Sequence, residues 1–247
     1  LLEHVFGLPS SRATRDIDFA FAVESWEQFQ ALKQRLVSTA SFTPLERVAQ
    51  RLTFKPDAMN HSVVVDLIPF GGLETESSLI AWPPDMRVMM NVAGYRDAHV
   101  AAMPVEIEPG LIISLASLPG IAILKIFAWM DRGKEDPKDA IDLVTLLRQY
   151  NEAGNQDRVY SEASSALEGA GYDIELAGAW LLGSDAAAMA LPATHTKLKE
   201  RFNDPSITER LITDMSRAMR THDNAVESSR TLLTQFVKGF LQTPIGK

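Results

Sequence analysis

The stretch that decides the fold is residues 16–23, DIDFAFAV, in which polar or small residues alternate with larger apolar ones. Such alternation predicts a β-strand with two different faces. One face is apolar and is expected to point into a core: Ile17, Phe19, Phe21 and Val23. The other face carries Asp16 and Asp18, whose Cα atoms lie about 7 Å apart in a strand. Neighbouring carboxylates repel each other unless a cation lies between them, so this strand is a candidate cation site.

A second acidic strand is expected at residues 61–70, HSVVVDLIPF, which are rich in β-branched residues and precede two glycines. Asp66 lies within it between two apolar residues, where a carboxylate is costly unless it is paired or binds a metal. If the two strands are neighbours, Asp16, Asp18 and Asp66 converge, and oxygen-only ligands suit Mg²⁺ or Mn²⁺. An Asp-x-Asp pair alone occurs often by chance and favours a structural role. The third aspartate shifts the interpretation toward a metal site.

The sequence around these strands predicts a small sheet with helices beside it. Ser25 is placed to cap a helix, with Gln28 three residues later as its capping-box partner. Further strands are expected at residues 47–54, 87–93 and 99–107, and the last two are expected to pair as a hairpin.

From residue 114 onward the sequence is predicted to be helical. Ser117 is expected to cap a helix that reaches about Asp131, and Asp136 is expected to cap the next one. Four further helical stretches follow, at residues 159–168, 174–182, 206–219 and 225–241.

This order of elements predicts an α+β fold, in which a mixed β-sheet domain with flanking helices precedes a C-terminal helical domain. We place the boundary near Pro109 and Gly110, which divides the chain into domains at residues 1–109 and 110–247.

The composition narrows the class of protein. Hydrophobic residues make up 46% and charged residues 23% of the 247, which is ordinary for a folded protein with a core. No apolar run approaches the roughly 20 residues of a membrane span. The chain has no cysteine, which excludes disulfides, zinc–cysteine sites and thiol catalysis and suits a cytoplasmic protein. Its five histidines are scattered, and its net charge of −8 disfavours non-specific nucleic-acid binding.

Several motifs resemble those of the nucleotidyltransferase superfamily. Residues 12–19, RATRDIDF, resemble its R-x-T-x-D-h-D-h signature, in which h is an apolar residue. Residues 64–68, VVDLI, resemble its third-carboxylate strand, and residues 125–142 resemble its later K…R…KD-x-x-D pattern. The sequence looks closest to the AbiEii/AbiGii-type predicted nucleotidyltransferases. The resemblance implies a nucleotidyltransferase-like fold and an enzyme that moves a nucleoside monophosphate from a nucleoside triphosphate to an acceptor.

The resemblance also implies roles for individual residues. Asp16, Asp18 and Asp66 would bind Mg²⁺ or Mn²⁺ and carry out catalysis, with Asp66 also helping to deprotonate the acceptor. Lys125 would approach the triphosphate, and its alternative is a core-helix lysine that extends to solvent. Four more residues are candidates for nucleotide or phosphate binding: Arg12, Thr14, Arg132 and Lys138. A second tier of site candidates contains Asp139 and Asp142.

Each of these residues also has a structural interpretation. Lys138 and Asp142 are four residues apart and suit a surface ion pair on a helix. Asp139 would stabilise the start of its helix, and Arg132 would stabilise the end of its helix, because each has the charge that the helix dipole favours there. For the pair Arg12 and Thr14, the alternative is that they order the loop before the acidic strand.

One element of the family pattern has no match in residues 1–11: a Gly-Gly or Gly-Ser turn whose amides hold the nucleotide phosphates. We expect this turn to lie upstream of Leu1. The alternative is a degenerate, non-catalytic nucleotidyltransferase-fold module that binds nucleotide or protein. A metal-dependent phosphate hydrolase is a third hypothesis, and the scattered histidines argue against it.

AbiEii-like proteins act as toxins of toxin–antitoxin pairs, and some modify tRNA ends. The resemblance therefore implies a nucleoside triphosphate substrate, an acceptor that is RNA such as tRNA or a protein, and a cognate antitoxin. No membrane partner is expected. The acidic net charge mildly disfavours a large RNA acceptor, and the C-terminal helices are expected to choose the acceptor.

Overall fold

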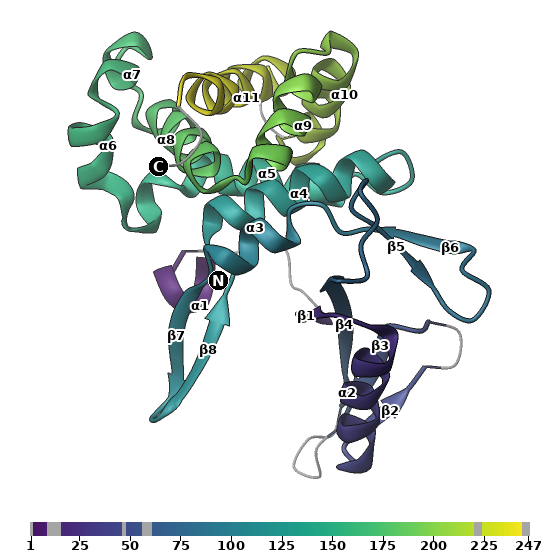
Figure 1. Ribbon diagram of the computed structural model, residues 1–247. Helices are drawn as coiled ribbons and strands as arrows, with labels where there is room; N and C mark the ends of the chain where they lie inside the picture. Colours follow the sequence, from purple (N-terminus) through teal and green to yellow (C-terminus); the bar gives the residue numbers. More distant parts are fainter. Residues whose placement is uncertain (1, 9–15, 46–47, 56–60, 220–223, 244–247) are drawn as a thin grey trace. The chain divides into compact units, whose positions relative to one another are not determined.

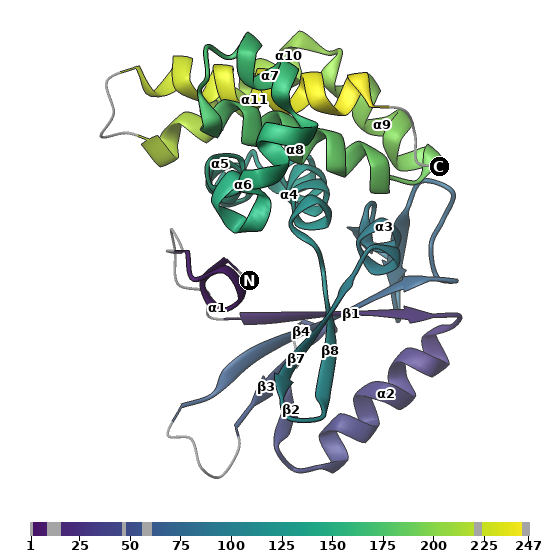
Figure 2. The same ribbon diagram turned by 90° about the vertical axis from the view of Figure 1, so that its left-hand side faces the viewer.

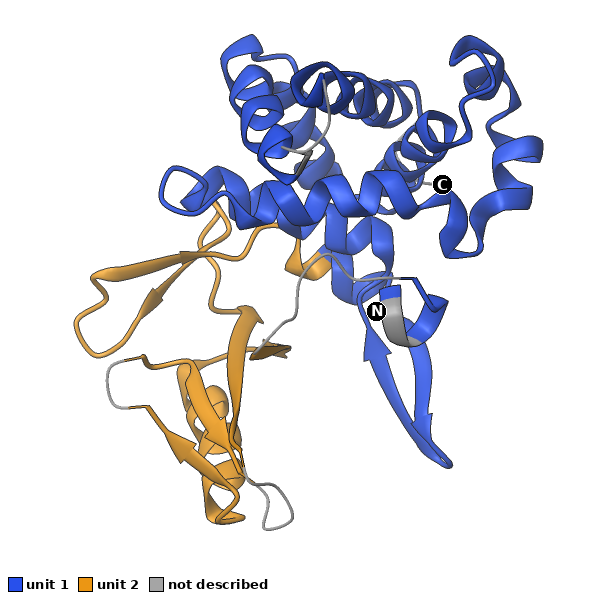
Figure 3. Cartoon of the chain, turned by 180° about the vertical axis from the view of Figure 1, so that it is seen from behind, with its two compact units in different colours: residues 1–11, 97–247 blue, residues 12–96 orange. Residues whose placement is uncertain are grey.

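The computed structural model describes residues 2–8, 16–45, 48–55, 61–219 and 224–243. The chain forms two compact units (Figure 3). We call residues 12–96 the sheet unit and residues 1–11 with 97–247 the helical unit. This division into compact units does not show which segments fold independently. The predicted domain boundary at residues 109 and 110 therefore stays a prediction.

The sheet unit is built on a four-stranded mixed sheet with the strand order β1-β4-β3-β2. In that order the strands are β1 (Asp16–Val23), β4 (Val63–Gly71), β3 (Arg51–Phe54) and β2 (Phe42–Pro44). β1 runs parallel to β4, whereas β3 is antiparallel to both β4 and β2. The predicted acidic strands are therefore confirmed, and they are direct neighbours.

Helix α2 (Trp26–Ser38) follows β1 and packs against this sheet (Figure 1). It begins as predicted, because the Ser25 hydroxyl accepts from the Gln28 amide at 3.4 Å and the Gln28 side chain accepts from the Glu24 amide at 2.8 Å. Its Phe29 side chain is fully buried. The same core cluster contains residues from β3 and β4: Leu52, Val65 and Leu67.

The prediction that the apolar face of β1 is buried holds for only part of the strand. Val23 is buried and Phe21 is half-buried, but Ile17 and Phe19 are 48% and 45% exposed. The core cluster of the sheet unit includes Val23 and contacts Phe21 but does not extend to Ile17 or Phe19, so the pattern that identifies the strand does not ensure that its whole apolar face is covered.

The predicted hairpin of residues 87–93 and 99–107 is wrong. β6 (Val88–Asn91) pairs instead with β5 (Leu79–Trp82), and β7 (Met103–Glu108) pairs with β8 (Leu111–Leu115). Residues 109–110, Pro-Gly, form the tight connection of this second hairpin, where Gly110 has a φ of +80°. Because Pro-Gly is a strong turn former, it directs β7 to pair with the next segment of the chain.

The residues expected to form the hairpin turn begin helix α3 (Tyr95–Val100) instead. Its Asp97 carboxylate is buried and accepts from the Leu191 amide at 2.6 Å and from the Thr194 hydroxyl at 2.8 Å. Both partners lie at the start of helix α9 (Pro192–Phe202), 94 and 97 residues further along the chain. A tertiary contact therefore fixes a helix where local residue preferences favour a turn.

The helical unit contains most of the helices (Figures 1 and 2). Besides α1 (Leu2–Phe6), they are α4 (Leu118–Arg132), α5 (Lys138–Gln149), α6 (Gln156–Glu162), α7 (Ser164–Gly169), α8 (Ile174–Met189), α9 (Pro192–Phe202), α10 (Pro205–Ser216) and α11 (Ala225–Gln242). Residues Asn151–Asn155 form a kink between α5 and α6, where Gly154 has a φ of +79°, and a short 3₁₀ segment occupies Arg217–Met219. Ser117 caps α4 as predicted, and Asp136 accepts from the Lys138 amide at the start of α5. α9 was not predicted.

Helix α8 lies at the centre of this unit. Its own apolar residues are spread over nearly every side of the helix, as in a helix that is buried all round. It packs against α11 without intervening side chains at two glycines, Gly183 and Gly239. A Cβ at Gly183 would lie 2.0 Å from the Phe236 carbonyl oxygen, and one at Gly239 would lie 2.0 Å from that of Trp180. The close approach of the two helices therefore requires glycine at both positions.

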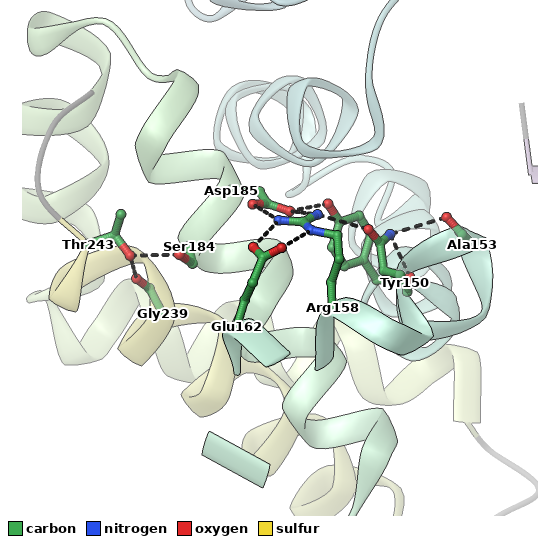
Figure 4. A network of polar contacts seen from close by, with 9 residues as sticks. Tyr150, Ala153, Arg158, Glu162, Ser184, Asp185, Gly239 and Thr243 are labelled. Atoms are coloured by element: carbon green, nitrogen blue, oxygen red, sulfur yellow. Dashed lines mark hydrogen bonds and ion pairs between the residues drawn. The ribbon is translucent and has the colours of Figure 1, made fainter. Parts of the chain in front are cut away.

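A polar network holds α6 against α8 (Figure 4). Arg158 donates two hydrogen bonds of 2.8 Å to the Asp185 carboxylate and two of 2.9 Å to the Glu162 carboxylate. The Tyr150 hydroxyl also donates to Asp185. Burial, together with the nearby Asp185 carboxylate, raises the pKa of Tyr150, so its hydroxyl stays protonated as the donor. A further hydrogen bond of 2.9 Å goes to the Asn155 side-chain oxygen, so polar groups of this unit engage the whole guanidinium.

A sheet unit followed by helices confirms the predicted α+β class. Among the helices of the described ranges, none combines the length and apolar composition needed to cross a membrane.

Candidate active site

Three aspartates lie on one face of the sheet, and we call Asp16, Asp18 and Asp66 the acidic trio. Asp18 of β1 is the direct register partner of Asp66 of β4. Register partners on neighbouring strands project from the same face and are about 4.8 Å apart. Asp16 precedes Asp18 by two residues, so it shares this face. The predicted convergence of the two strands thus brings the trio onto a single surface.

The three carboxylates differ in their surroundings. Asp16 and Asp18 are exposed, whereas Asp66 is only 8% exposed. Arg51 is the register partner of Asp66 on its other side, in β3. Its Nε lies 2.8 Å from Asp66 Oδ1 and its Nη2 lies 2.6 Å from Oδ2. Arg51, Asp66 and Asp18 therefore form a line across three adjacent strands.

Arg51 interacts electrostatically with the whole trio. Its hydrogen bonds to Asp66 are the main cause that raises the pKa of Arg51, and the negative charges of Asp66, Asp16 and Asp18 raise it further. Arg51 thus faces three carboxylates, which leaves these four side chains with a formal excess of two negative charges. Sequence reasoning missed Arg51, because only the register of β3 against β4 places it beside Asp66.

The donor chemistry of the trio fits a hard divalent cation, since carboxylate oxygens are the ligands that Mg²⁺ and Mn²⁺ prefer. The excess negative charge on one surface is the condition that such an ion relieves. Among the described residues, no three Asp, Glu, His or Cys side chains are arranged as a ready-made metal site. Both oxygens of Asp66 accept hydrogen bonds from Arg51, so this carboxylate is already paired with a cation of the protein itself.

The later motif residues form a second cluster in the helical unit, where we call Lys125, Arg132, Asp139 and Asp142 the α4–α5 cluster. Lys125 of α4 lies 3.1 Å from Asp139 and 2.6 Å from Asp142, both in α5. Arg132 donates two hydrogen bonds to the same Asp139 carboxylate, from Nε at 2.8 Å and from Nη2 at 3.1 Å. The structure therefore brings these four predicted residues together within the helical unit.

The α4–α5 cluster is balanced in charge and has one buried carboxylate at its centre. The Asp139 side chain is fully buried, whereas those of Lys125 and Arg132 are 26% and 49% exposed. Burial alone would raise the pKa of Asp139, but the hydrogen bonds from Arg132 and the charge of Lys125 outweigh it and lower the pKa. Burial likewise opposes the charge on Lys125, but the Asp142 and Asp139 carboxylates raise its pKa.

The remaining candidates lie elsewhere. Lys138, at the start of α5, lies 3.6 Å from the Asp136 carboxylate, while Asp142 accepts from Lys125. Arg12 and Thr14 fall outside the described residues. The catalytic, metal-binding and phosphate-binding roles assigned to all these residues therefore stay predictions.

A small mixed sheet with an acidic edge strand, an acidic neighbour and a following set of helices defines a nucleotidyltransferase-like α+β protein. Comparison with family models identifies which one, because the family described as "Nucleotidyl transferase AbiEii toxin, Type IV TA system" matches residues 1–234. The chain belongs to this family. Comparison with curated proteins finds no significant match.

Membership in this family confirms the resemblance seen in the motifs and makes the chain a nucleotidyltransferase. It favours the enzyme over the non-catalytic binding module and the phosphate hydrolase considered from the sequence.

Proposed function

We propose that this protein transfers a nucleoside monophosphate from a nucleoside triphosphate to an acceptor, and that the acidic trio is its reaction centre. The observation that carries the proposal is the register of β1 against β4, which aligns Asp18 with Asp66 and leaves Asp16 on the same face. Family membership supports the type of reaction. The excess of carboxylates over cations supports a requirement for a divalent cation, for which we propose Mg²⁺, with Mn²⁺ as the alternative.

In the proposed reaction, an acceptor oxygen attacks the α-phosphorus in line. The bond from that phosphorus to the bridging oxygen breaks, and pyrophosphate leaves. Bound divalent cations would neutralise phosphate charge and activate the acceptor oxygen. Asp16 and Asp18, being exposed on the edge strand, would hold these ions, and Asp66 would complete their binding. Asp66 would also take the proton that the acceptor loses.

The basic residues have a more limited proposed role. Lys125 and Arg132 are engaged by Asp139 and Asp142, so a phosphate must compete with carboxylates already in place. Arg132 has the more exposed side chain of the two and is the better candidate for a phosphate contact. Lys138, Arg12 and Thr14 remain further candidates, with Asp139 and Asp142 as the groups that orient Lys125.

For the acceptor we propose RNA such as tRNA, or a protein, and for the partner a cognate antitoxin, in keeping with the toxin–antitoxin family. A cytoplasmic location is proposed because nucleoside triphosphates are available there. The net charge of −8 favours a small or protein acceptor over an extended RNA.

The test is to incubate the protein with each α-³²P-labelled nucleoside triphosphate, Mg²⁺ and either total RNA or lysate protein. Label on a macromolecule from the α-phosphate, but not from a γ-labelled triphosphate, indicates nucleotidyl transfer. Nuclease or protease sensitivity of the product then identifies the acceptor. We expect Asp16→Asn and Asp18→Asn each to reduce transfer about a thousandfold, the size of effect seen when a preorganised electrostatic group is removed.

The matched control is Glu76→Gln, which removes an exposed carboxylate of the same unit away from the trio. It is expected to keep full activity, and circular dichroism should show all three variants folded. Full activity in both aspartate variants would contradict the proposed site.

A further inference from the structure

Arg51 contacts the acidic trio directly, through the carboxylate of Asp66. Its guanidinium forms a two-point fork on Asp66, and its side chain is 36% exposed while that of Asp66 is 11% exposed. Direct register partners on antiparallel strands fix this pair from both backbones. The fork is thus a feature of the sheet itself rather than a chance meeting of surface side chains.

A bidentate fork has two consequences for the carboxylate that it holds. It fixes the rotation of the carboxylate, because two parallel hydrogen bonds of 2.8 and 2.6 Å must both be kept. It also leaves lone pairs free, since an ionised carboxylate has about four acceptor sites and the fork occupies two. Asp66 can therefore be held in one orientation by Arg51 and still offer oxygens to another ligand.

The charge of Arg51 acts beyond this pair. Asp16 and Asp18, across β4 from Arg51, also stabilise its charged form. A divalent cation that binds the trio must therefore bind next to a fixed positive charge. Like charges at short range oppose each other, so Arg51 weakens cation binding at the same time as it orients Asp66.

We propose that Arg51 is a positioning residue of the nucleotidyl-transfer site, holding Asp66 in its working orientation and competing with divalent cations for the acidic trio. The inference rests on the proposed function of the trio. It predicts that loss of Arg51 changes cation binding and turnover in opposite directions, which a purely structural ion pair would not do.

The test compares two variants of the full chain. Arg51→Gln removes the charge and the fork, whereas Arg51→Lys keeps the charge but cannot form the two-point fork. Mn²⁺ binding is measured directly, from the electron paramagnetic resonance signal of free Mn²⁺ and by calorimetry, without substrate. Turnover is measured separately, as kcat and KM at saturating Mg²⁺. The matched control is Arg87→Gln, which removes an exposed arginine of the same unit that pairs with Asp85.

For Arg51→Gln we expect the dissociation constant for Mn²⁺ to fall on the order of tenfold, because one opposing charge is removed from a partly exposed site. We expect kcat to fall about 10- to 100-fold, as is usual when the partner of a metal-binding group is lost. Arg51→Lys should keep the wild-type affinity for Mn²⁺ within about twofold but lose kcat like the glutamine variant. Arg87→Gln should change neither quantity.

A folded Arg51→Gln protein whose Mn²⁺ affinity is unchanged or weaker than that of the wild type overturns the proposal. If Arg51→Gln does not fold, Arg51→Lys decides it, because full kcat in that variant shows that the fork positions nothing. Failure of the proposed function gives a different result from failure of this inference. A wild-type protein that binds Mn²⁺ through Asp16 and Asp18 but transfers no nucleotide would refute that function, while tighter Mn²⁺ binding by Arg51→Gln would still show the competition. Absence of Mn²⁺ binding in every variant overturns both.

Discussion

The acidic trio of the sheet unit and the α4–α5 cluster of the helical unit are built from the same kinds of side chain but differ in charge balance. The trio sets three aspartates against Arg51, whereas the cluster sets Asp139 and Asp142 against Lys125 and Arg132. The first has a formal excess of two negative charges, and the second is balanced. Two of the three carboxylates in the trio are exposed, whereas the Asp139 side chain at the centre of the cluster is fully buried.

In the proposed function the acidic trio binds a cation, whereas the α4–α5 cluster neutralises its own charges within the chain. A balanced network around a buried carboxylate satisfies its own charges and joins two helices, so removing that carboxylate leaves its partners uncompensated. Carboxylates that share one surface repel each other, so removing one of them reduces that repulsion. The same substitution, aspartate to asparagine, should therefore have opposite effects on stability in the two places.

The largest effect on stability is expected for Asp139→Asn. It removes the carboxylate that both Lys125 and Arg132 contact, and we expect the free energy of unfolding to fall by about 3 kcal/mol. This lies at the low end for a broken buried pair, because both cations are partly exposed. Urea denaturation of the variant and the wild type at pH 7 measures the difference.

The matched comparison is Asp16→Asn, which should leave the melting temperature unchanged or raise it in the absence of divalent cations. If Asp139→Asn is too unstable to purify, Asp142→Asn provides a smaller step in the same direction, because Asp142 contacts Lys125 at 2.6 Å but its side chain is 19% exposed. Equal stability of the Asp139 variant and the wild type would remove the distinction between the two regions.

A somewhat smaller effect is expected from adding a divalent cation. Mg²⁺ or Mn²⁺ at 100 times its dissociation constant should stabilise the wild type by about 2.7 kcal/mol, the linkage value for a ligand that binds only the folded state. The double variant Asp16→Asn/Asp18→Asn should lose this stabilisation, whereas Asp142→Asn should keep it. Melting temperatures measured with and without the cation test this, and an equal increase in every variant would argue against a site at the trio.

The elements that the sequence predicts well are those fixed by nearby residues. β1 has its predicted bounds because alternation over eight residues is unambiguous, and α2 and α4 start where Ser25 and Ser117 cap them. Neighbouring caps and turns act within a few positions of the chain, so a single sequence is enough to locate them.

The features that the sequence does not predict depend on distant residues. α3 forms where its Asp97 meets Leu191 and Thr194, almost a hundred residues later. The Arg51–Asp66 fork depends on the register of two strands, and Arg51 itself belongs to no motif. The later motif residues were identified, but their mutual ion pairs depend on how α4 packs against α5. Sequence patterns thus identify candidate site residues, and the tertiary structure decides which of these residues are already paired with opposite charges.

The smallest expected effect is the pH dependence of the stability that Asp139 contributes. The folded-state pKa of Asp139 lies below its ordinary value of 3.8, because the hydrogen bonds from Arg132 and the charge of Lys125 outweigh the opposing effect of burial. A carboxylate with a lowered folded pKa contributes stability that is complete above the unfolded pKa and is lost as the pH falls through the folded one. The stability gap between the wild type and Asp139→Asn should therefore be constant from pH 7 to about 5 and should shrink below pH 3.8. Urea denaturation across that range measures the gap, with Glu76→Gln as the control that should follow the wild type throughout. A gap that stays constant down to pH 3 would mean that Asp139 stabilises the fold through packing and hydrogen bonding alone, and the contrast in charge balance would then not explain its stability.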